Sequence, residues 1–319
     1  MKCRLGYVSL ALDLEKVTSS SVVTYRHYKS LTSEQKINKL KKVTLSNLQD
    51  LEKILNYNAE NDIHFYRLTS NLVPLATHPD VVDWDYRKFF SIDFEYIGKL
   101  IRKYDMRVDL HADQFNVINS TNKDIVEKTI TNLYFLAMIL EDIGLYNGKI
   151  IIHVGSSMGG KKESINRFKT NFKHFPKIVT DKIIIENDDK IFNIIDVLKL
   201  CNELKVPMVL DAHHYRCNNE GENLYEYIGD IFDTWNNDVW LPKIHYSSGR
   251  DSKLDRKHSD YIFAKEFIDF VEQVRNVQNR DFDIMLESKK KEIALFKLME
   301  DIKELKKDWS YIDKTTFEL

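Results

Sequence analysis

Short, continuous apolar runs alternate with longer stretches of helical periodicity along the whole chain. Eight of the runs have strand length, and several contain consecutive Ile, Val and Leu residues instead of alternating apolar and polar positions. That composition is expected for parallel strands that are covered on both faces. The predicted strands are residues 3–10, 65–70, 107–112, 149–155, 182–188, 207–213, 241–247 and 283–288.

The segments between these runs place their apolar residues on one helical stripe. The pattern is clearest in residues 122–145 and 191–204, and residues 32–61 form a third predicted helix. Gly144 and the Val206–Pro207 step lie where helices are expected to end.

Eight strand–helix repeats in one chain predict a single α/β domain, a (β/α)8 TIM barrel over residues 1–319. Such barrels usually need about 250 residues, so the remainder should be elaborated loops at the C-terminal face. We expect the last twelve or so residues to form a tail. A doubly wound open sheet is the alternative that fits the same alternation. The predicted loop elaborations are residues 14–34, 71–90, 156–165 and 247–257.

Composition excludes several classes of protein. The 319 residues are 43% hydrophobic and carry a formal net charge of −2, which is typical of a folded domain and leaves room for a local basic surface that binds nucleic acid. No apolar run reaches 18 residues, so no membrane span is predicted, and the N-terminus reads as a strand and not as a signal peptide. Cys3, Cys201 and Cys217 support neither a disulfide framework nor a structural zinc site, which predicts the cytoplasm.

Six consecutive predicted strands end at a residue type that binds metal ions. Because the carboxyl ends of barrel strands meet at one face, these side chains should converge in space. Histidines and carboxylates without cysteine suit Zn²⁺, Mn²⁺ or Fe²⁺, and their number indicates two or three ions, as in phosphoryl transfer. The alternative is a set of hydrogen-bonded strand ends. The residues are His111, His153, Glu186, Asp211 with His213 and His214 after it, His245 and Glu287.

Other polar residues give weaker signals. Lys243 precedes His245 by two and shares its face, so it is either a lysine that CO₂ carboxylates into a ligand or, as the pattern alone favours, a lysine that reaches solvent. Lys161, in the glycine-containing loop after the fourth strand, and Arg250, in loop 247–257, are candidates for phosphate contacts. We interpret four further residues as structural, namely His27, His64, Arg67 and His174.

Several motifs spread over almost the whole chain have a recognisable counterpart. They are Gly6-Tyr7, the segment from Leu72 to Pro79, the segment from His111 to Phe115, His153-Val154-Gly155, Glu186-Asn187-Asp188, Asp211 through His214, the segment from Pro242 to His245, His258 through Tyr261, and Met285-Leu286-Glu287. In these motifs the chain resembles the UV damage endonuclease family of DNA repair nucleases, which is related to apurinic endonucleases and xylose isomerases.

The resemblance implies a nuclease that nicks duplex DNA immediately 5′ of UV photoproducts, namely cyclobutane pyrimidine dimers and 6-4 photoproducts, with abasic sites as a further substrate. It implies up to three divalent ions, usually Mn²⁺, with Mg²⁺, Zn²⁺ or Co²⁺ as alternatives. The resemblance implies that Lys243 is carboxylated at the metals. Glu186 and Asp211 are expected to bridge ions because a carboxylate can span two metals. The implied ligands are His111, His153, Glu186, Asp211, His214, His245, His258 and Glu287, with His214 preferred over His213.

The resemblance also implies contacts to DNA. Gln114 and Phe115 match a pair that wedges into the duplex where damaged bases have flipped out. Tyr7 matches a tyrosine near the lesion pocket, and His78 approaches the DNA. Ala11 stands where relatives carry asparagine, so a polar contact in the lesion pocket is lost or supplied otherwise.

These inferences predict UV-damaged double-stranded DNA as the partner of a monomeric protein, which works at the nucleoid and not at a membrane. The alternatives are an apurinic endonuclease or a sugar isomerase on the same barrel, and a non-catalytic, metal-dependent DNA binder. The Gln114–Phe115 pair argues against an isomerase, which has no use for a wedge.

Overall fold

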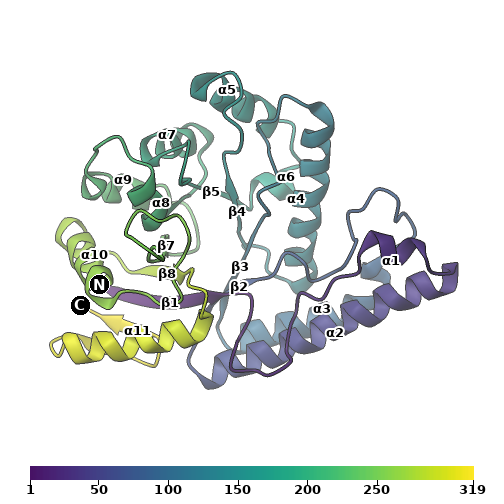
Figure 1. Cartoon of the computed structure of the whole chain (residues 1–319), viewed down its shortest axis with the longest axis horizontal. Helices are drawn as coiled ribbons and strands as arrows, with labels where there is room; N and C mark the ends of the chain where they lie inside the picture. Colours follow the sequence, from purple (N-terminus) through teal and green to yellow (C-terminus); the bar gives the residue numbers. More distant parts are fainter.

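The computed structural model describes all residues 1–319, and its centre is a closed barrel of eight parallel strands (Figure 1). Each strand pairs with the next, and β1 pairs with both β8 and β2, so the ring has no open edge there. The predicted barrel is confirmed, and the doubly wound open sheet is excluded. The strands are β1 (Lys2–Val8), β2 (Phe65–Leu68), β3 (Arg107–His111), β4 (Ile150–His153), β5 (Ile183–Glu186), β6 (Met208–Asp211), β7 (Lys243–Tyr246) and β8 (Phe282–Leu286).

Helices surround the strands on the outside (Figure 1). No helix is both long enough and apolar enough to cross a membrane. The helices are α1 (Tyr25–Lys29), α2 (Ser33–Glu60), α3 (Tyr86–Lys103), α4 (Lys123–Ile143), α5 (Lys161–Phe172), α6 (Lys177–Thr180), α7 (Ile194–Leu204), α8 (Ala212–Cys217), α9 (Ile228–Asp233), α10 (Ala264–Val277), α11 (Lys291–Leu305) and the 3₁₀ helix η1 (Leu224–Glu226).

The ends of the predicted helices follow from local chemistry. Thr32 and Gln35 form a reciprocal capping box at the start of α2, so the helix begins where the sequence placed it. Asn193 caps the backbone N–H groups of the first turn of α7, which therefore begins three residues later than predicted. Gly144 ends α4 in the left-handed conformation that glycine adopts without steric cost.

The lumen is arranged in layers because alternate residues of each strand point inward. Ile151, Ile184 and Val209 pack with Trp235 in an apolar cluster inside the barrel. Two residues further along β4, β5 and β6 are His153, Glu186 and Asp211. The apolar layer therefore forms a floor beneath the polar ends of the strands.

The last residues do not form the expected tail. They form an antiparallel pair of strands, β9 (Ser310–Tyr311) and β10 (Thr316–Glu318), and β10 pairs with the first residues of β1. Both termini consequently lie together, and Leu319 donates its backbone N–H to the Met1 carbonyl at 3.1 Å (Figure 1). The three cysteines are free, as predicted.

Candidate metal centre

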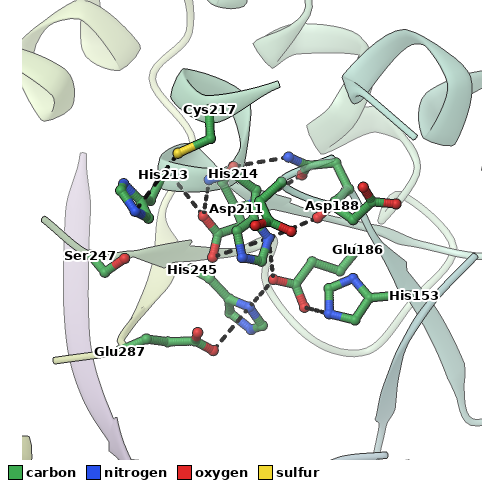
Figure 2. Close-up of polar contacts among 12 residues, drawn as sticks. His153, Glu186, Asp188, Asp211, His213, His214, Cys217, His245, Ser247 and Glu287 are labelled. Carbon is green, nitrogen blue, oxygen red and sulfur yellow. Dashed lines mark hydrogen bonds and ion pairs between the residues drawn. The ribbon is translucent and has the colours of Figure 1, made fainter. Parts of the chain in front are cut away.

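Glu186 lies at the centre of the polar layer, at the carboxyl end of β5. Its Oε2 is 3.0 Å from Nε2 of His111 and 3.6 Å from Nε2 of His153, and its Oε1 is 2.9 Å from Nδ1 of His245. His214 approaches Oε1 to 3.4 Å. Figure 2 shows His153, His214 and His245 converging on this carboxylate from different strands and from α8.

Three groups of side chains offer ligand atoms close enough together to hold a metal ion, and Glu186 belongs to all three. The groups are His111, His153 and Glu186; Glu186, His245 and Glu287; and Glu186, Asp211 and His214. The six predicted strand ends are thus brought together, and of the two adjacent histidines His214 joins the centre. A shared carboxylate can bridge neighbouring cations, so the arrangement suits more than one ion.

Asp211 is held in place because it is both the last residue of β6 and the N-cap of α8. Its Oδ1 accepts the backbone N–H groups of His213 and His214, each at 2.7 Å. Its own backbone exchanges two hydrogen bonds with the side chain of Asn187. Because α8 begins directly after Asp211, its first turn brings the ring of His214 back toward Glu186.

The electrostatics of the centre come from burial and from mutual contact. Burial lowers the pKa of His153 and of His245, which favours the neutral imidazole that a metal ion binds. Burial opposes the charged form of His214 too, but Asp211 and Glu186 outweigh it and raise its pKa to about 9. For Glu186, burial is outweighed by His245 and His153, so the pKa of its carboxyl lies well below the ordinary value.

The donor atoms fit divalent metal ions. Oδ2 of Asp211 is buried and has no hydrogen-bond partner, and a buried carboxylate oxygen without a partner is energetically costly unless a cation binds it. Imidazole nitrogens and carboxylate oxygens without thiolates are the ligands that Mn²⁺, Fe²⁺ and Zn²⁺ accept. These residues would therefore hold the ions that the sequence predicted.

Arg67 lies inside the centre, and its interpretation as a residue with no part in the site was wrong. Its Nη1 is 2.5 Å from Oε1 of Glu287, and its Nη2 is 2.6 Å from Nε2 of His245. The three histidines interpreted as structural belong to none of these groups; His64, for example, bonds to the Tyr104 carbonyl. A signal was present in the sequence, because Arg67 is a charged residue within a buried strand.

Lys243 occupies the layer below the ligands. Its side chain is fully buried and pairs with Asp109, so the alternative of a lysine that reaches solvent is wrong. Burial lowers the pKa of its amine to about 8.

His258 and His213 border the centre without entering any of the three groups. Nδ1 of His258 lies 2.6 Å from the Glu287 carbonyl, and its ring centroid is 6.5 Å from that of His214. His213 is buried with Nε2 3.0 Å from the Asp255 carbonyl, so its ring is engaged elsewhere.

Gln114 and Phe115 are exposed in the loop that follows β3. Phe115 is 77% exposed, an unusual fraction for a large apolar side chain, and His111 lies only four residues before it. A cavity of about 340 Å³ is lined by Gln114 together with His153 and Asp188. Gln114 thus lies beside the centre, Phe115 follows it in the exposed loop, and the role of the pair as a wedge stays a prediction.

The side chains of the other predicted DNA contacts are buried or already engaged with neighbours within the protein. Tyr7 is fully buried and donates its hydroxyl to Asn58 of α2 at 2.7 Å, so it does not face the barrel opening. His78 stacks on Tyr25 with ring centroids 3.9 Å apart. Arg250 and Lys161 are both partly exposed and paired with carboxylates, those of Asp251 for Arg250 and of Asp196 and Glu220 for Lys161.

Comparison with known proteins agrees with this geometry. A family model described as UV-endonuclease UvdE matches residues 3–315. The chain belongs to this family. UvdE relatives include a UV DNA damage endonuclease of Bacillus cereus strain B4264, 37% identical over 306 residues that cover 95% of each chain. A UV DNA damage endonuclease of Bacillus thuringiensis subsp. konkukian strain 97-27 is 35% identical over 310 residues, 96% of each chain.

A solved structure supports the same membership in the UvdE family. The crystal structure of SacUVDE superimposes with a TM-score of 0.84 at 35% sequence identity, and the match covers 95% of this chain and 99% of that one. The correspondence therefore extends over the barrel and its loops, and it places the chain among DNA repair endonucleases.

Proposed function

We propose that this endonuclease nicks duplex DNA immediately 5′ of UV photoproducts by metal-dependent hydrolysis of the phosphodiester. The observation that carries the proposal is one buried carboxylate, Glu186, shared by three candidate ion sites at the rim of the barrel. The exposed Gln114–Phe115 pair beside it supports a substrate whose base stacking is already disturbed. Cyclobutane pyrimidine dimers, 6-4 photoproducts and abasic sites are the proposed lesions.

The proposed cofactors are up to three divalent cations, Mn²⁺ by preference and Mg²⁺, Zn²⁺ or Co²⁺ as alternatives. When bound, such ions activate water and neutralise the charge of the reacting phosphate. The proposed ligands are the members of the three groups, with His258 completing a site from the rim and Lys243 acting from the layer below. They are His111, His153, Glu186, Asp211, His214, His245, His258, Glu287 and Lys243.

The chain's own side chains orient the reaction. Glu186 and Asp211 are nearly inaccessible to solvent. Water and salt therefore screen their negative charges only weakly, and the attraction of these carboxylates for a cation in the centre is strong. The backbone of β6 and the first turn of α8 fix Asp211 from two sides, which keeps its free Oδ2 directed into the centre. Hydrolysis of the bond would leave a 3′-hydroxyl and a 5′-phosphate end.

Recognition of damage is assigned to the Gln114–Phe115 pair. A side-chain amide can replace lost base pairing, and an aromatic ring can replace lost stacking, when the damaged bases leave the duplex. Lys161 and Arg250 would contact the phosphate backbone after releasing their present carboxylate partners. His78 would contact the DNA as well. Tyr7 would support the lesion pocket from behind through its bond to Asn58.

A plasmid assay tests the proposal. UV-irradiated supercoiled plasmid should be nicked in Mn²⁺ and left intact in excess EDTA, while unirradiated plasmid should stay intact in both. Equal nicking in EDTA would refute metal dependence. An abasic oligonucleotide cut faster than an irradiated one would favour an apurinic endonuclease, and tight binding without turnover in any of the four ions would indicate a DNA binder.

A further inference from the structure

Arg67 places a permanent positive charge against one of the three candidate ion sites. Its guanidinium contacts Glu287 at 2.5 Å and His245 at 2.6 Å, and both are members of the same group. No arginine or lysine bonds to the side chains of the other two groups, and the shared Glu186 contacts histidines only. The three groups are therefore electrostatically unequal.

The hydrogen bonds of His245 make this contact and ion binding mutually exclusive. Nδ1 faces both carboxylates, 2.9 Å from Glu186 and 3.4 Å from Glu287, while Nε2 lies against Arg67. A guanidinium can only donate, so Nε2 must be the acceptor and the proton of the neutral ring must sit on Nδ1. An ion on Nδ1 needs that nitrogen free of its proton, which moves the proton to Nε2 and sets it against an arginine N–H.

The protein also contains a second position for the guanidinium. Nε of Arg67 is buried without a hydrogen-bond partner, and so is Oδ1 of Asp109 one layer below. The two atoms are 3.9 Å apart, within an ion pair but beyond a hydrogen bond. A small displacement of Arg67 toward Asp109 would satisfy both atoms while releasing His245 and Glu287.

We propose that Arg67 is the resident cation of the Glu186–His245–Glu287 group, and that an ion entering this group displaces it toward Asp109. The centre then fills in order, with this group last and weakest. The inference rests on the metal centre of the proposed function. Arg67 acts here as a positioning residue that sets how many ions the centre holds.

A titration with Mn²⁺ tests the inference through binding and not through activity. Free Mn²⁺ is followed by electron paramagnetic resonance in the wild type, Arg67→Met and Arg67→Lys, after circular dichroism shows that each is folded. Removing the charge in Arg67→Met should tighten the weakest class of Mn²⁺ by at least about tenfold, because a cation at contact distance opposes the ion. Arg67→Lys keeps the charge and should stay close to the wild type.

A matched control separates this contact from a general loss of positive charge. Arg216 lies near the same rim but bonds to the Ser247 carbonyl and to Tyr246, outside the three groups. Arg216→Met should leave the weakest Mn²⁺ unchanged. Equal tightening in both variants, or unchanged or weaker binding in Arg67→Met, overturns the inference. A wild type that binds no Mn²⁺ removes the metal centre itself, and with it the proposed function.

The unmodified protein provides a measurement that does not depend on a variant. Nitrogen-15 spectra of the His245 ring, assigned with His245→Asn, should show the proton on Nδ1 in metal-free protein. Titration with Zn²⁺, which is diamagnetic, should move that proton to Nε2 only with the last ion bound. A proton on Nε2 before any metal is added would contradict the arrangement.

Discussion

The chemistry of the centre depends on single side chains whose positions in the lumen leave few substitutes. Glu186 contacts four imidazoles and belongs to every candidate ion site, so its loss should affect all ions together. Asp211 and Glu287 each belong to one site only. Glu186 is therefore the single residue on which the proposed metal centre depends most.

Replacing Glu186 by glutamine should abolish ion binding and lower nicking of irradiated DNA by more than about 100-fold. Changes to residues that only support metal ligands already cost about 10- to 100-fold, so the loss of a shared ligand must cost more. Metal content after dialysis and initial nicking rates measure the two effects. Glu203→Gln, at an exposed pair with Lys169, should match the wild type in both. Retained ions in Glu186→Gln would show that the three sites are independent.

Phe115→Ala should weaken binding to an irradiated duplex while leaving the fold and the metal content intact. Stacking of one base on an aromatic ring is worth about 1–3 kcal/mol, which corresponds to a loss of about 5- to 150-fold in affinity. Fluorescence anisotropy in Mg²⁺ with irradiated and unirradiated oligonucleotides provides the measurement. Tyr146, another highly exposed aromatic residue, which precedes β4, supplies the control in Tyr146→Ala. Unchanged affinity in Phe115→Ala would remove the wedge from the mechanism.

At the scale of elements, the strands carry polar side chains at both ends of the lumen, and the two ends have different consequences. At the carboxyl ends a ligand oxygen, Oδ2 of Asp211, is buried without a partner, whereas at the amino ends both oxygens of Asp283 are paired with arginines. Asp283 of β8 accepts hydrogen bonds from Arg107 of β3 and Arg4 of β1. This cluster joins strands across the barrel and belongs to stability, not to catalysis.

Asp283→Asn should destabilise the protein by about 3–5 kcal/mol, because Arg107 would stay buried without its counter-ion. Thermal and urea unfolding measure the change. Asp233→Asn, at an exposed pair with Arg280, should cost less than about 1 kcal/mol. Similar losses in the two variants would mean that the buried cluster contributes no more than a surface pair.

The same carboxylate predicts a pH dependence of stability. Burial alone would raise the pKa of Asp283, but Arg107 and Arg4 outweigh it, so the pKa in the folded protein lies below the ordinary value. A lowered folded pKa means that the stabilisation is fully present above the unfolded pKa of about 3.9 and is lost as pH falls through the folded pKa. In acid, the difference in unfolding free energy between wild type and Asp283→Asn should therefore shrink.

At the scale of the whole molecule, the C-terminal strands β9 and β10 extend the sheet beside the start of β1. β10 pairs with the start of β1 on the side where β2 pairs with its end, so the two termini stabilise each other. Phe317 is fully buried, stacked on Trp309 and packed against the edge of Phe267. The segment expected to be a tail is part of the core.

Phe317→Ala should lower the free energy of unfolding by about 3–5 kcal/mol, as for other buried aromatic truncations. Ile312→Ala, in the same segment but 54% exposed, should change it by less than about 0.5 kcal/mol. Denaturant unfolding of the full chain compares the two. A small effect in Phe317→Ala would support the original expectation of a dispensable tail.

The sequence by itself determined the barrel and the residue types at its rim. Parallel strands that are covered on both faces must be apolar for several consecutive residues, and a histidine or carboxylate at their end is visible without coordinates. Since closure brings all carboxyl ends together, the convergence of His111, Glu186 and Glu287 could be predicted from local pattern and one rule of topology.

Only the tertiary structure decided which neighbours the inward-facing residues meet. The sequence shows that Arg67, Lys243 and Tyr7 lie on strands, but not that Arg67 meets Glu287, Lys243 meets Asp109, or Tyr7 turns to α2. These pairings join residues from about 50 to more than 200 positions apart. They depend on strand register and side-chain direction across the closed barrel, and a one-dimensional pattern contains neither.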